Sequence, residues 1–125
     1  MISLLVLTAA ASADLDALDQ AVARCDRPTA TPVFASETRR RAQFLVDAYR
    51  EQESIVIDRR QLASDRRAAR EGGDNGDFTL RQQSLDDRQR ALNDSRSLES
   101  AREQAMDAMR HYFLLNCGVG RDRLD

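Results

Sequence analysis

Residues 72–77 read Gly-Gly-Asp-Asn-Gly-Asp, and this stretch decides the fold. Gly and Asn tolerate left-handed backbone angles, so the composition predicts a turn. Long stretches rich in Ala, Leu, Arg, Glu and Gln lie on both sides, and the chain has only two Pro and five Gly. Because these residues are good helix formers, we predict an all-α protein in which two helices fold back as a long antiparallel hairpin.

The first arm of the hairpin has two alternative predicted starts. Thr31 can serve as N-cap with Pro32 at the first helical position, or Ser36 can serve as N-cap. The arm is expected to end near Glu71, where the two glycines stop it.

The second arm is expected to begin near Asp77 or Thr79 and to run to Asn116. Thr79 and Gln82 have the spacing of a capping box, in which a hydroxyl and a side-chain amide satisfy exposed backbone amides. We therefore expect this pair to start the helix.

Apolar side chains repeat every seven residues in both arms, as a two-helix coiled-coil seam requires. The series consists of Ile55, Leu62 and Ala69 in the first arm and of Leu85 and Leu92 in the second. Arg59 and Arg66 lie near it, and the step from Leu92 to Leu98 breaks the period. Nearby opposite charges at i, i+4 are each worth about 0.2–0.5 kcal/mol, so we expect the many charges mainly to keep this coiled-coil-like arm soluble.

A short helix is predicted over residues 14–25, where Leu15, Leu18 and Val22 share one face. It should cap the apolar end of the hairpin, away from the turn. Cys25 and Cys117 then meet at this base, and in an oxidising compartment they should form a disulfide. Closing a loop of that length would stabilise the fold by about 4 kcal/mol. The alternative is two buried free thiols.

The first residues, MISLLVLTAAASA, carry no charged side chain and end in an A-x-A-like site. This pattern is typical of a secretory signal peptide over residues 1–13, cleaved before Asp14. The remaining 14–125 would form a single helical-hairpin domain without a membrane span, because the apolar stretch is shorter than the roughly 20 residues needed. The alternative is that residues 1–13 form a buried helix of a cytosolic protein.

The charge pattern narrows the function classes. Acidic and basic side chains number 21 and 19, so the chain lacks the strongly basic footprint of a nucleic-acid binder. All cations are Arg, and without Lys no Schiff base can form. His111 is the single histidine; with Asp107 and Glu103 it would supply only half a metal shell. We therefore predict no catalytic, cofactor-binding or metal-binding residues and no enzyme activity.

These features together predict a periplasmic or secreted protein that acts by binding other proteins or itself in the bacterial envelope, with a chaperone-like holdase as the narrower version. An incomplete apolar seam on a projecting arm would gain from partner helices. One alternative is a small inhibitor or regulator of an envelope enzyme. Another, if no signal is cleaved, is a cytosolic coiled-coil interaction protein.

Overall fold

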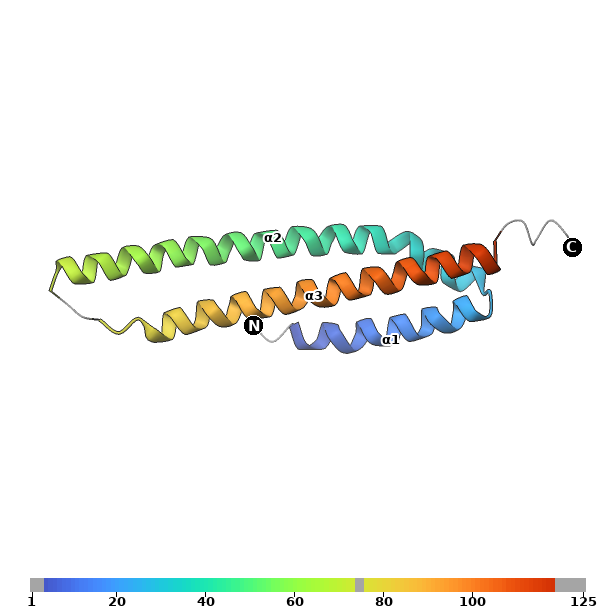
Figure 1. The fold of residues 1–125 in the computed structure, drawn as a ribbon, viewed down its shortest axis with the longest axis horizontal. Coiled ribbons are helices and arrows are strands. Elements are labelled where there is room, and N and C mark those ends of the chain that lie inside the picture. The colour runs from blue at the N-terminus through green and yellow to red at the C-terminus, as the bar shows by residue number, and fades with distance from the viewer. Residues whose placement is uncertain (1–3, 74–75, 119–125) are drawn as a thin grey trace, which may run out of the picture. The chain divides into compact units, whose positions relative to one another are not determined.

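The structure describes residues 4–73 and 76–118, with side chains described from residue 14 onward, and most of these residues are helical. In this computed structural model, α1 spans Leu4–Ala23, α2 spans Arg27–Glu71 and α3 spans Thr79–Asn116 (Figure 1). The predicted all-α class is confirmed. The chain divides into two compact units, which we call the hairpin unit, Arg41–Ala101, and the three-helix unit, Met1–Arg40 with Arg102–Asp125.

In the hairpin unit, α2 and α3 pack along each other in antiparallel directions (Figure 1). Four of the five members of the predicted seven-residue series are buried, with no more than 6 % exposure: Ile55, Leu62, Leu85 and Leu92. Ala69, nearest the turn, is only partly buried. Ala48 extends the series by one heptad, and Phe44 packs against it. Leu98 is 60 % exposed, so the predicted break in the period is confirmed.

The end of α2 follows the prediction. The amide of Gly72 donates to the carbonyl of Ala68 (3.0 Å) and the amide of Gly73 to that of Arg70 (3.2 Å). Gly73 has a φ of 72°, in the left-handed region where glycine carries no Cβ penalty. The helix therefore ends at Glu71, as expected.

The start of α3 is at Thr79, but the predicted capping box is wrong. The carboxylate of Asp77 accepts a hydrogen bond from the amide of Thr79 (2.9 Å), while the side chain of Gln82 donates to Asp86 (3.1 Å). An acidic side chain just before the helix satisfies an exposed amide and opposes the positive end of the helix dipole. Hydrogen bonding by the side chain of Thr79, and then by its amide, holds the pKa of Asp77 below its usual value.

The start of α2 differs from both predicted starts, because the helix begins at Arg27. Asp26 accepts hydrogen bonds from the amide of Thr29 (3.4 Å) and from its hydroxyl (2.7 Å). Pro28 stands in the first turn, where its fixed φ suits a helix and its missing amide costs nothing. Pro32 lies inside the helix. The physical reason for the error is that Asp26 caps the chain before Thr31 can.

The three-helix unit has its own apolar core, drawn from α1, the first turns of α2 and the last turns of α3. Its buried members are Leu18, Ala21, Val22, Ala30, Phe34, Met106, Phe113 and Cys117. The rings of Phe34 and Phe113 lie 5.8 Å apart between centroids. The predicted helix over 14–25 is confirmed in type, but α1 is longer at its N-terminal side.

The disulfide joins Cys25 to Cys117, whose Cα atoms are 5.4 Å apart and which are separated by 92 residues in the sequence. Cys25 follows α1 with a φ of 54°. The amide of Cys25 donates to Val22 (3.1 Å) and that of Asp26 to Ala21 (2.8 Å). This is a Schellman motif with cysteine in the left-handed position that glycine usually fills. The helix end thereby directs Cys25 toward the C-terminal end of α3.

Candidate functional site

Ion pairs line one side of the hairpin seam. Arg88 of α3 donates from Nε to Glu51 Oε1 (3.0 Å) and from Nη1 to Asp58 Oδ2 (2.6 Å). One heptad nearer the turn, Arg81 donates to Asp65 Oδ2 (2.7 Å). The three acids are seven residues apart on α2, and the two arginines are seven residues apart on α3. The seam therefore has an apolar row and a charged row with opposite signs on the two helices.

These pairs set register more than they add stability. Their side chains are about a quarter to a half exposed, so each pair is worth no more than about 1 kcal/mol. Interhelical charges of this kind select orientation and register in coiled coils. Hydrogen bonds to Glu51 and then to Asp58 raise the pKa of Arg88, so it keeps its charge at any biological pH. The charge pairs expected at i, i+4 lie within one helix, so they do not include this row, which joins α2 to α3.

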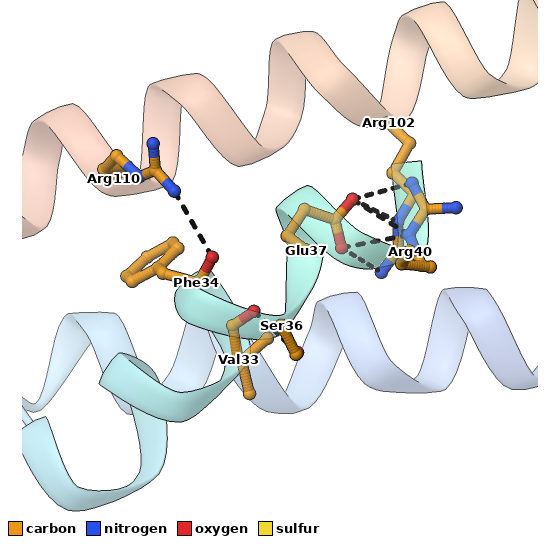
Figure 2. A network of polar contacts seen from close by, with 7 residues as sticks. All are labelled: Val33, Phe34, Ser36, Glu37, Arg40, Arg102 and Arg110. Atoms are coloured by element: carbon orange, nitrogen blue, oxygen red, sulfur yellow. Dashed lines mark hydrogen bonds and ion pairs between the residues drawn. The ribbon is translucent and has the colours of Figure 1, made fainter. Parts of the chain in front are cut away.

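Glu37 is the centre of a less exposed ion-pair cluster in the three-helix unit (Figure 2). Arg40, one turn later on α2, donates from Nη2 to Oε1 (2.7 Å), and Arg102 of α3 donates from Nε to the same oxygen (3.0 Å) and from Nη2 to Oε2 (3.2 Å). The side chains of Glu37 and Arg102 are 14 % and 12 % exposed. The cluster thus ties α2 to α3 by bidentate, charge-assisted hydrogen bonds.

The pKa of Glu37 reflects two opposing effects. Burial raises it, but the hydrogen bonds and charges of Arg40 and Arg102 outweigh burial and lower the pKa to about 2. The carboxylate stays ionised at neutral pH and is neutralised by two arginines. Such a group holds helices together and is not poised to transfer protons, because a catalytic acid or base needs a pKa near the working pH.

Arginine and aromatic side chains also meet near the disulfide. The guanidinium of Arg27 lies 5.5 Å from the ring centroid of Phe113 and donates to the carbonyl of Cys117. Arg110 lies 5.7 Å from the ring of Phe34 and donates to the carbonyl of the same residue (3.3 Å; Figure 2). A cation at the C-terminal end of α3 opposes the negative end of its dipole.

The side of α2 opposite the seam carries an exposed apolar patch within the hairpin unit. Its members are Leu45, Val46, Tyr49, Val56 and Ile57. Exposure rises to 69 % at Tyr49. At 3.6 residues per turn the five side chains fall within an arc of about 120°, roughly opposite Ile55. We call this the outer patch. Several large apolar side chains exposed on one side of a helix are typical of interaction sites.

The sequence alone does not show which apolar residues of α2 form the outer patch. The sequence places these apolar residues in the first arm, but a run of apolar letters does not reveal which of them the partner helix covers. Of the two series in this part of α2, only the one through Ala48 and Ile55 is buried. The seven-residue spacing in the sequence distinguishes the buried series from the exposed one.

The residues weighed for metal binding do not converge. His111 and Asp107 are both exposed on α3. Within the described parts of the chain, no three His, Cys, Asp or Glu side chains are grouped so that they could hold a metal ion. The turn predicted over residues 72–77 includes residues 74 and 75, which lie outside the described residues.

None of the helices in the described part of the chain is long and apolar enough to cross a membrane. The predicted signal peptide over residues 1–13 is not tested by the structure and stays a prediction. No protein-family model, curated protein or solved structure matches the chain.

Proposed function

We propose that this protein works by protein–protein binding, with no enzymatic step, through the outer patch of its hairpin unit. The observation that carries the proposal is the exposure of five large apolar side chains, from Leu45 to Ile57, on the side of α2 that α3 does not cover. Burying such a side chain is worth roughly 1.5–3 kcal/mol, so a partner helix or an unfolded segment gains from covering the patch.

The contacts that the structure describes between α2 and α3 support this proposal, because none of them uses the outer patch. The apolar row and the ion pairs of Arg81 and Arg88 lie on the seam side of α2. These contacts hold α2 and α3 together without using the outer patch. A helix whose own packing is complete can offer its other face without unfolding. The narrower form of the proposal is a holdase that shields unfolded clients.

The experiment is suppression of aggregation of a chemically denatured client diluted into buffer with the oxidised protein at a near-stoichiometric ratio. We expect suppression by the unmodified protein and its loss in Tyr49→Asp and Ile57→Asp. Leu80→Asp is the matched control, because Leu80 is also exposed but lies outside the patch. If all variants suppress aggregation equally, the outer patch is not the binding site. If the unmodified protein neither suppresses aggregation nor yields crosslinked partners, protein binding is not the function.

The proposed location is the bacterial envelope, as a periplasmic or secreted protein. Two features support it: the apolar stretch before Asp14 and the pairing of Cys25 with Cys117, since disulfides persist in oxidising compartments. The test is the intact mass after expression in a Gram-negative host, with and without reductant. A species that begins at Asp14 and gains two hydrogens on reduction is expected; a longer species with free thiols would overturn the location.

A further inference from the structure

The outer patch has a palindromic order along α2. Two apolar pairs, Leu45 with Val46 and Val56 with Ile57, lie at equal distances on either side of residue 51. Between them lie Tyr49, Arg50 and Glu53, all exposed. A surface whose pattern reads the same in both directions is what an isologous two-fold contact requires, because each residue meets its counterpart from the other copy.

We propose that the outer patch binds a second copy of this chain, with the two α2 helices antiparallel and the two-fold axis near residue 51. This inference rests on the proposed function and names the partner of the same patch. In that register Leu45 meets Val56 or Ile57 of the second copy, so the apolar pairs cover each other, and the centre holds polar side chains that can pair.

Charge complementarity selects the antiparallel arrangement. With the axis at residue 51, Arg50 comes opposite Gln52 of the second copy. Glu53 is the next residue along, about 1.5 Å further on the helix, so Arg50 approaches Glu53 of the second copy twice by symmetry. Within the part of the chain that the structure describes, neither side chain takes part in an ion pair of its own. In a parallel pair, Arg50 would instead face Arg50 of the second copy, and Glu53 would face Glu53. Like charges in direct apposition are unfavourable.

The flanks of the patch are compatible with the same register. Arg60 comes opposite Ala42 of the second copy, and both residues lie on the same side of α2 within the hairpin unit. Arginine stems can lie over small apolar residues while their charges stay in water. The patch spans 13 residues, about 20 Å of helix, so the contact is smaller than a standard interface and we expect dissociation in the micromolar range.

The test is sedimentation velocity of the oxidised full chain over a micromolar concentration series, with reciprocal charge variants. We expect the unmodified protein to pass from monomer to dimer. Arg50→Glu and Glu53→Arg should each weaken association by about tenfold or more, since each replaces two attractions with two repulsions. The double variant, and an equimolar mixture of the two single variants, should associate again. Leu80→Asp is the control that should leave association unchanged.

Each outcome decides the proposal. Restoration by the double variant establishes the antiparallel contact, because only a self-complementary pair is restored by exchanging both charges. A monomer at every concentration, or single variants that associate as well as the unmodified protein, would overturn it. If the protein stays monomeric but still suppresses client aggregation through Tyr49 and Ile57, the self-association fails while the proposed function stands.

Discussion

Replacing Glu37 by Gln should destabilise the three-helix unit in a way that depends on pH. The variant keeps the shape and one hydrogen-bond acceptor but removes the charge between Arg40 and Arg102. The fall of the Glu37 pKa from 4.5 to about 2 sets an upper limit of about 3.5 kcal/mol, at about 1.4 kcal/mol for each pKa unit. Solvent screens part of this attraction, so we expect a loss of about 1–2 kcal/mol at pH 7.

The direction of the pH effect follows from the lowered pKa. Above about pH 4.5 the carboxylate is ionised in the folded and unfolded protein, and the full stabilisation is present. As the pH falls toward 2, the unfolded protein binds the proton first, so the stabilisation is lost progressively over this range. The Glu37→Gln variant has no such proton to bind, and its difference from the unmodified protein should therefore shrink toward zero near pH 2.

The measurement is urea unfolding followed by far-ultraviolet circular dichroism from pH 7 down to pH 2. Asp94→Asn serves as the control, because it removes an exposed helical carboxylate from α3. The control should lose no more than about 0.5 kcal/mol, as surface substitutions usually do. The reasoning is refuted if Glu37→Gln matches the control at pH 7, or if its deficit is the same at pH 7 and near pH 2.

Two further changes test the core and the disulfide. Ile55→Ala, at a fully buried seam position, should cost about 2–5 kcal/mol in urea unfolding, whereas Leu98→Ala, at an exposed position, should stay near zero; similar costs would contradict the seam. Replacing Cys25 and Cys117 together by Ser should cost about 4 kcal/mol, because the 92-residue separation gives the unfolded chain much entropy to regain. Reduction of the unmodified protein should match that loss, and an unchanged midpoint would contradict it.

The sequence by itself determined the helices, the hairpin and the identity of its apolar seam. Helix formers and the glycines at 72 and 73 are local signals, and the seven-residue spacing of Ile55 with Leu62 reports which face of a helix a partner covers. The pairing of Cys25 with Cys117 followed from the same topology, because the ends of a hairpin away from its turn must meet.

Only the tertiary structure decided which charges pair. Arg102 has Glu99 and Glu103 as acidic neighbours in the sequence, yet its guanidinium reaches Glu37, which lies 65 residues away. Exposed ion pairs differ from one another by a few tenths of a kcal/mol, so local spacing does not select among them. Packing of α3 beside the first turns of α2 selects the partner, because it brings the two side chains together where little water reaches them.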